Sequence, residues 1–105
     1  MNFRANLNER IKTMIEEFKN NEEGYLNWVS DNPEGYIVNI DYHGTDPDYP
    51  MVHRATHKSV TTSKTGNFTT TQYYKVCANN LDDLENWSQQ LFDKKLKYCQ
   101  TCMKQ

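Results

Sequence analysis

Two pairs of metal-binding side chains constrain the fold of this chain more than any other feature of its sequence. A C-x-x-C pair, Cys99 and Cys102, lies close to the C-terminus, and a histidine pair four residues apart, His53 and His57, lies far upstream. Two thiolates and two imidazoles are a donor set for tetrahedral zinc. We therefore expect a fold that brings the two pairs together around one zinc ion.

Each pair also has an ordinary explanation. His53 can be a partly buried strand histidine and His57 a surface residue, and a C-x-x-C near a terminus is often incidental. The third cysteine, Cys77, follows Val76 in a β-rich run and is expected to be a small buried apolar residue. It is the natural substitute as a ligand if one of the histidines does not bind the metal.

The size and composition favour one small domain that benefits from a metal. The chain has 105 residues and is 36% hydrophobic, with seven Tyr, four Phe and two Trp to supply buried area. Bound metal stabilises a core of this size. We expect a single domain over 1–105, with an N-terminal amphipathic helix in 1–20 and a zinc-binding α+β core in 21–105.

The charge and the cysteine count limit partners and compartment. A formal charge of −2 gives no general attraction to nucleic acid or to an anionic membrane, so DNA or RNA binding would need a local basic patch. No long apolar run can span a bilayer, and the polar first ten residues are no signal peptide. Three cysteines do not make a disulfide framework, so we expect a reducing, cytoplasmic location.

Three helices are predicted from apolar periodicity and capping residues. The first covers 3–18, and its apolar stripe consists of Phe3, Leu7, Ile11, Met14, Ile15 and Phe18. The second begins at the N-cap Asn21 and ends before Pro33, because the residue preceding a proline avoids helical backbone angles. The third begins at the N-cap Asn80 and runs towards the C-x-x-C.

Three strands are predicted between the second and third helices. They cover 36–42, 49–54 and 68–78, and the polar 58–67 would connect the last two as a hairpin. The expected fold is therefore α+β, with two N-terminal helices, a small antiparallel three-stranded sheet and a C-terminal helix, stapled by zinc.

The predicted hairpin explains how the two pairs would meet. His53 would lie at the edge where the third strand begins, and that strand would run away from this edge to Cys77. The C-terminal helix, packed back across the sheet, would then return Cys99 and Cys102 to His53 and His57. At 1.5 Å per residue of a helix of roughly 15 residues, Cys77 would be left more than about 20 Å away.

Several segments, taken in order, resemble a group of small uncharacterised bacterial proteins. They are G-Y-I-V-N at 35–39, H-R-A-T-H at 53–57, K-V-C at 75–77, L-E-N-W at 84–87 and the terminal C-x-x-C. The resemblance covers about 23–102. In that group the position of His57 holds a cysteine, so the exchange keeps a zinc ligand, and a cysteine also stands where Cys77 is. Some members lie near nuclease or restriction genes, an association that transfers no activity to this chain.

The donor set gives little support for catalysis. Four ligands fill a zinc tetrahedron and leave no open position for a substrate or water. A second cluster around one loop can in principle hold a hard metal ion, although a solvated turn is its ordinary explanation; it consists of Asp41, His43, Asp46 and Asp48. Thiol redox chemistry of Cys99 and Cys102 would suit the N-terminal end of a helix, whereas this pair follows the predicted helix.

We therefore expect a zinc-stabilised binding module without catalytic activity, associated with nucleic-acid processing. The candidate binding surface is basic and comprises Arg54, Lys58, Lys94 and Lys95. The ordinary alternative is that these side chains only solvate loops and a helix end. A protein partner is an equal candidate, and the chain would be a monomer or a homodimer formed through the N-terminal helix. The alternative functions are a thiol redox protein and an accessory subunit of a nuclease or restriction system.

Overall fold

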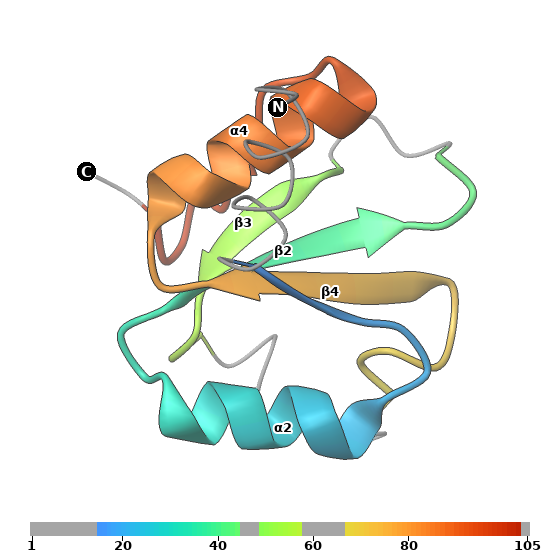
Figure 1. The fold of residues 1–105 in the computed structure, drawn as a ribbon, viewed down its shortest axis with the longest axis vertical. Coiled ribbons are helices and arrows are strands. Elements are labelled where there is room, and N and C mark those ends of the chain that lie inside the picture. Colours follow the sequence, from blue (N-terminus) through green and yellow to red (C-terminus); the bar gives the residue numbers. More distant parts are fainter. Residues whose placement is uncertain (1–14, 45–48, 58–66, 104–105) are drawn as a thin grey trace, which may run out of the picture.

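The structure is a computed structural model, and its described part comprises residues 15–44, 49–57 and 67–103. Within these ranges the sheet has five strands, and one helix lies on each of its faces (Figure 1). The elements in chain order are β1 (Glu16–Phe18), α2 (Glu22–Asp31), β2 (Tyr36–Asp41), β3 (Met51–Arg54), β4 (Tyr73–Ala78), α4 (Leu81–Phe92) and β5 (Lys97–Tyr98).

Both helices begin where the sequence predicts a cap. The side chain of Asn21 accepts a hydrogen bond from the Gly24 amide at 2.9 Å, and that of Asn80 accepts one from the Asp82 amide at 2.8 Å. Each bond satisfies an amide that has no partner within the first turn of its helix. At its other end, α4 stops at Asp93, whose φ of 52° is left-handed and cannot continue a helix.

The long strand β2 lies at the centre of the sheet, whose strand order is β1-β4-β2-β3-β5. β2 pairs antiparallel with β4 on one side and with β3 on the other, and β1 pairs antiparallel with β4. The exception is β5, which runs parallel to β3, with Met51 opposite Lys97 and Val52 opposite Tyr98. The sheet is therefore mixed, and a two-residue strand forms the edge beside β3.

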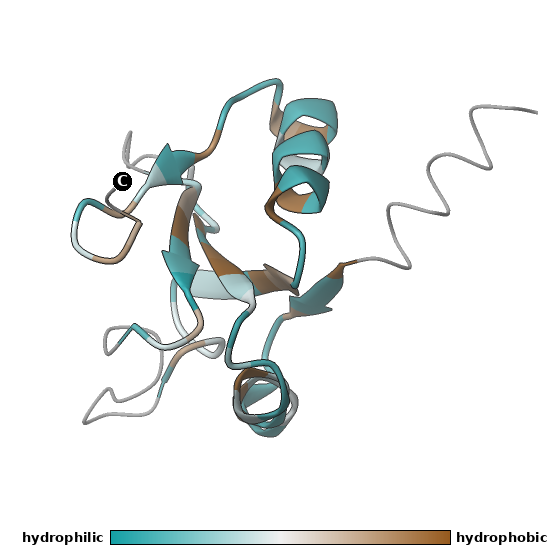
Figure 2. Ribbon diagram, turned by 90° about the vertical axis from the view of Figure 1, so that its left-hand side faces the viewer, coloured by the Kyte–Doolittle hydropathy of each residue, from teal (hydrophilic) through white to brown (hydrophobic). Residues whose placement is uncertain are grey.

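Apolar side chains alternate between the two faces of the sheet, as the period of two in a strand requires. In β2, Ile37 packs on the face covered by α2, and Val38 packs on the face covered by α4. Leu84 and Trp87 of α4 belong to the same buried cluster as Val38, whereas Tyr25 of α2 belongs to the same cluster as Ile37. Figure 2 shows the hydrophobic strands between the two helices.

A lysine is buried in the face covered by α2. Lys75 is 4% exposed, and its ammonium donates to the Asn39 side-chain oxygen and to the Phe68 carbonyl, each at 2.7 Å. Burial lowers the pKa of Lys75 to about 8, although the nearby Glu22 carboxylate acts in the opposite direction. The two bonds tie the segment before β4 to the centre of the sheet.

The prediction of a three-stranded antiparallel sheet with three helices is wrong, although the α+β class is right. Part of the predicted first helix is a strand, because Glu16–Phe18 pair with residues of β4. Ile15 and Phe18 fit a helical stripe by their spacing, but these pairings decide the local structure. The rest of that prediction, 1–14, lies outside the described residues.

The predicted hairpin is wrong as well. β3 and β4 are not neighbours, because β2 lies between them and pairs with both. The strand β5 was missed since 94–98 carries three lysines and no clear alternation. In the ranges that the structure describes, no helix has the length and apolar composition needed to cross a bilayer.

Candidate metal centre

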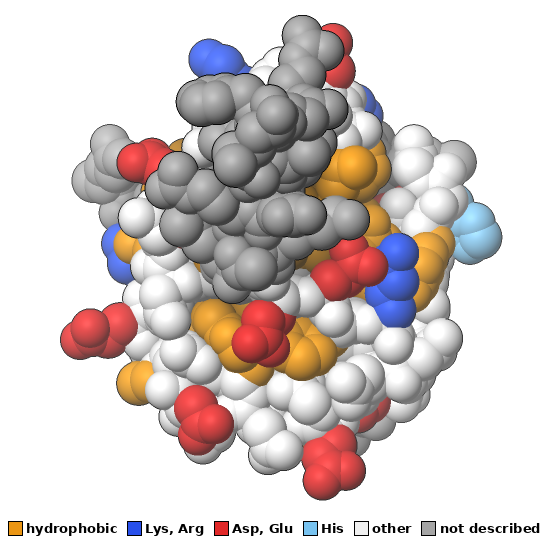
Figure 3. Space-filling model, in the orientation of Figure 1, with side chains coloured by type: hydrophobic (Ala, Val, Ile, Leu, Met, Phe, Trp, Pro, Cys, Tyr) orange, Lys and Arg blue, Asp and Glu red, His pale blue; other side chains and the backbone are white. Residues whose placement is uncertain are grey.

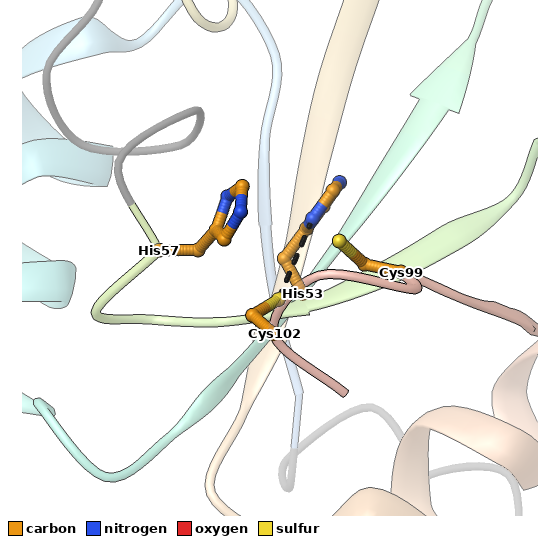
Figure 4. Close-up of side chains that lie close together, drawn as sticks. All are labelled: His53, His57, Cys99 and Cys102. Atoms are coloured by element: carbon orange, nitrogen blue, oxygen red, sulfur yellow. Dashed lines mark hydrogen bonds between the residues drawn. The ribbon is translucent and has the colours of Figure 1, made fainter. Parts of the chain in front are cut away.

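The histidine pair is held by β3 and by the turn that follows it. His53 is the third residue of β3 and is buried, and the His57 amide donates to the Arg54 carbonyl at 3.0 Å, which closes the turn. The two imidazole rings stack at 5.3 Å between centroids, with 25° between their planes. Figure 4 shows both rings beside the two cysteine sulfurs.

The cysteine pair is carried to the histidines by β5. Along the parallel ladder, the Lys97 amide donates to the Pro50 carbonyl and the Cys99 amide donates to the Val52 carbonyl, both at 3.0 Å. Cys99 thus lies beside the residue that precedes His53. The chain then turns back, because the Met103 amide donates to the Cys99 carbonyl at 2.9 Å. This single turn brings the Cys102 sulfur round to the same point.

The four side chains lie close enough to bind one metal ion. One ligand atom from each of His53, His57, Cys99 and Cys102 lies within 4.8 Å of the others. Cys102 Sγ and His53 Nδ1 are 3.8 Å apart (Figure 4). A tetrahedron with zinc bonds of 2.0–2.3 Å has edges of about 3.3–3.8 Å. The Cys102–His53 pair is therefore within about 0.3 Å of the sulfur–nitrogen edge of such a tetrahedron, and shifts of about 1 Å bring the other pairs to their edge lengths.

The surroundings of His53 favour the form that binds a metal. Burial lowers the pKa of His53 to about 4, and the neighbouring His57 and Lys75 act in the same direction. The imidazole is therefore neutral at physiological pH, as a metal ligand must be.

The pKa values of the Cys99 and Cys102 thiols are shifted in opposite directions. Burial opposes ionisation of Cys99, but hydrogen bonds from the backbone of Cys102 and of Thr101 lower the pKa of its thiol below the ordinary value. Burial raises the pKa of Cys102, and the neighbouring Cys99 adds to this effect. Cys99 is therefore the first thiolate, and a bound cation would assist the second ionisation.

Arg54 supports Cys102 with two hydrogen bonds that sequence reasoning missed. Its backbone amide donates to Cys102 Sγ at 3.3 Å, and its side-chain Nε donates to the Cys102 carbonyl at 2.8 Å. Donors of this kind orient a metal ligand and stabilise its thiolate. The sequence marks Arg54 only as a basic residue, because a backbone donor leaves no trace in an amino-acid pattern.

Cys77 is not part of this group, but the predicted reason was wrong. It lies opposite Ile37, which lies opposite His53, so two strand spacings, about 10 Å, separate the backbones of Cys77 and His53. Its side chain is fully buried in the core under α2, and burial raises the pKa of its thiol. The expectation of a small buried apolar residue is confirmed.

The predicted basic surface is divided by the structure. Arg54 lies beside the cysteines, whereas the exposed Lys94 and Lys95 precede β5, at the end away from Cys99. Lys97, which follows these lysines, lies opposite Met51, and Met51 is three residues before Arg54 in β3. The lysines therefore lie about 10 Å from Arg54 along the strand. The remaining member, Lys58, lies outside the described residues.

The alternative cluster around the loop after β2 is described only in part. Asp41 accepts hydrogen bonds from the His43 amide and from the Gln72 side chain, both at 3.0 Å. The first bond closes the turn after β2, whereas Asp41 itself is buried and not solvated. Asp46 and Asp48 lie outside the described residues.

The prediction that Cys99 and Cys102 directly follow a helix, which argued against redox chemistry, was wrong. Cys99 and Cys102 follow β5 rather than the end of α4, so they are not placed at the negative end of a helix dipole. All three cysteines are free thiols. The donor set is thus chemically competent both for metal binding and for oxidation.

Comparison of the chain with protein-family models, with curated proteins and with solved structures gave no significant match. The resemblance to the small bacterial proteins stays a prediction, because none of these comparisons tests it.

The lowered pKa of His53 predicts a pH dependence for the metal-free protein. The folded state keeps His53 neutral down to a pKa of about 4, whereas the unfolded chain takes up a proton near 6.5. The contribution to the free energy of unfolding is full above pH 6.5 and falls as the pH drops towards 4. At about 1.4 kcal/mol per pKa unit, the loss is roughly 3 kcal/mol.

Denaturant unfolding of zinc-free protein at several pH values measures this loss, and His53→Asn should give a flatter profile. An NMR titration that found the His53 imidazole with an ordinary pKa in the folded, metal-free protein would contradict the burial argument.

Proposed function

We propose that this chain is a small zinc-stabilised module that works by binding a partner. One structural zinc ion, held by His53, His57, Cys99 and Cys102, fastens the C-terminal segment to β3. The observation that carries the proposal is the convergence of four ligand atoms to within 4.8 Å of one another. These residues come from two segments more than 40 positions apart in the sequence.

The donor types support zinc among the common metals. Thiolate and imidazole suit zinc, whereas magnesium and calcium require oxygen ligands. Among the four residues none offers a carboxylate, and two thiolates balance the charge of a divalent ion. A neutral, tetrahedral centre of this kind can be buried at modest cost.

A structural role for the metal follows because few other interactions hold the C-terminal segment, residues 96–103, against β3. β5 has two residues, and its ladder to β3 supplies few hydrogen bonds. Yet Leu96, Cys99 and Met103 from this segment are buried in the core on the α4 side. Metal bonds between this segment and β3 stabilise the folded state by constraining both.

For the partner we favour a protein over a nucleic acid. In the described part of the chain, Arg54 and Lys97 are the exposed basic side chains of β3 and β5 near the candidate ligands, and the Arg54 Nε already donates to the Cys102 carbonyl. Phosphate binding draws on several basic side chains arranged together. An accessory subunit of a nuclease or restriction system would have such a protein partner. Free thiols are consistent with a reducing, cytoplasmic setting.

Metal analysis of the purified protein tests the proposal. We expect about one zinc ion per chain. Cys99→Ser and Cys102→Ser should lose it, because each removes a thiolate. The matched control is Cys77→Ala, which removes a buried cysteine outside the group and should retain the metal. Loss of zinc in the control alone would move the site to Cys77, and metal-free protein with a Cys99–Cys102 disulfide would favour the redox alternative.

Removal of the metal should lower stability. At free zinc about 100-fold above its dissociation constant, binding contributes about 2.7 kcal/mol to the free energy of unfolding. Since about 1 kcal/mol shifts the unfolding midpoint of a domain this size by roughly 4–8 °C, a chelator should lower it by about 10–20 °C. Calorimetry with and without chelator measures this shift. The Cys102→Ser variant should not respond to chelator; an equal response would mean that the metal stabilises another site.

A further inference from the structure

A polar cleft lies between α2 and the part of the sheet where β1 begins and β4 ends. Its volume is about 480 Å³, within the range of roughly 300–1,000 Å³ that is usual for ligand-binding pockets. The side chains that line it comprise two carboxylates, three amides, one indole and two small buried groups; they belong to Glu16, Asp31, Asn27, Asn32, Asn79, Trp28, Cys77 and Ala78. The cleft shares no residue with the candidate metal centre.

The alternation of β1 places Glu16 on the side of the sheet that α2 covers. Phe18, two residues later, is buried in the core under α2, and so is Cys77, the partner of Glu16 in the ladder. The nearby Lys19 ammonium pairs instead with the Glu17 carboxylate, at 3.1 Å. In the ranges that the structure describes, the Glu16 carboxylate therefore faces the cleft without a paired cation.

The opposite wall of the cleft is held by hydrogen bonds and by a close backbone approach. The Asn79 side-chain amide donates to Asn32 Oδ1, and the Asn32 side-chain amide donates to the Trp28 carbonyl, both at 2.8 Å. A Cβ at Gly35 would lie 2.6 Å from Trp28 Cη2 and 2.9 Å from Asn79 Oδ1, so the two side chains need a glycine at this position. The indole and the amides are therefore positioned by the fold before any ligand binds.

The charges around the cleft favour a cation. None of the residues that line it is basic, and α2 contains Glu22, Glu23 and Asp31 but no lysine or arginine. Figure 3 shows acidic and no basic side chains over α2, in the lower part of the view. A surface of this sign attracts cations and repels phosphate and other anions.

The position of Asp31 is unfavourable for α2 itself. Asp31 is the last residue of the helix, and no basic residue lies in the last turn. The C-terminal end of a helix carries the negative end of its dipole, so a carboxylate there lowers the stability of the helix. Local conflicts of this kind are expected where function requires the residue. A cation bound in the cleft would be attracted by both the carboxylate and the helix dipole.

We propose that the cleft binds the guanidinium group of an arginine side chain of the protein partner. A guanidinium is planar and always charged, and its five N–H donors match carboxylate and amide oxygens. Its flat face also stacks on an indole, which a lysine ammonium cannot do in the same way. That the cation comes from a protein rests on the proposed function, whereas the cleft does not depend on the metal.

An NMR titration of the full-length chain with N-acetyl-arginine amide tests this site. The chain has two tryptophans, and the indole N–H signal of Trp28 should shift, whereas that of Trp87, buried in the core on the α4 side, should not. N-acetyl-citrulline amide keeps the shape of the side chain but has no charge. It should bind roughly tenfold more weakly, because two ion pairs are lost. An unshifted Trp28 signal, or equal binding of the citrulline compound, would overturn the proposal.

Variants of the two carboxylates locate the binding. Asp31→Asn and Glu16→Gln should each weaken binding of N-acetyl-arginine amide roughly two- to fivefold, as expected for a partly exposed ion pair. The matched control is Glu23→Gln, which removes an exposed carboxylate of the same helix that does not line the cleft, and it should leave the affinity unchanged. An equal loss in the control would overturn the proposal, because the cation would then be attracted by the whole acidic surface.

A capped peptide with two glycines on each side of one arginine separates a partner's side chain from a small molecule. It should bind as tightly as N-acetyl-arginine amide, because a partner's arginine enters the cleft with chain on both sides. Binding of free arginine without binding of this peptide would overturn the assignment to a protein partner. Zinc content measured on the same samples keeps a failure of the cleft distinguishable from a failure of the zinc-stabilised module.

Discussion

The short parallel ladder between β3 and β5 determines where the C-terminal cysteines lie. Through it the Cys99 amide bonds to the Val52 carbonyl, which places the C-x-x-C beside His53. Every other feature of the candidate centre depends on this pairing. Yet a two-residue strand at a sheet edge supplies little stability of its own. A metal bound across β3 and the segment after β5 would supply what the ladder lacks.

The position of the centre also follows from how the core is divided. The sheet buries apolar side chains on both faces, so each face has a small core of its own, under α2 and under α4. His53 lies on the α2 side of β3, whereas Cys99 packs into the core on the α4 side. The four candidate ligands therefore meet near the β3–β5 edge of the sheet, and a metal bound there would connect the two cores.

Local signals in the sequence predicted the elements better than their arrangement. The caps Asn21 and Asn80 and the β-rich run in 36–42 were enough to place two helices and the central strand. Pairing between distant segments was not predictable, because β1 and β5 have few residues and no alternation of their own. The convergence of His53, His57, Cys99 and Cys102 was predicted from donor type and spacing, although the predicted hairpin that would join them does not exist.

X-ray absorption at the zinc edge of the purified, full-length protein tests the central claim most directly. The account predicts a first shell of two sulfur atoms at about 2.3 Å and two nitrogen atoms at about 2.0–2.1 Å. A shell with three sulfur atoms would make Cys77 a ligand, and a shell dominated by oxygen would mean that the metal is bound elsewhere. Either result would contradict a zinc clasp formed by His53, His57, Cys99 and Cys102.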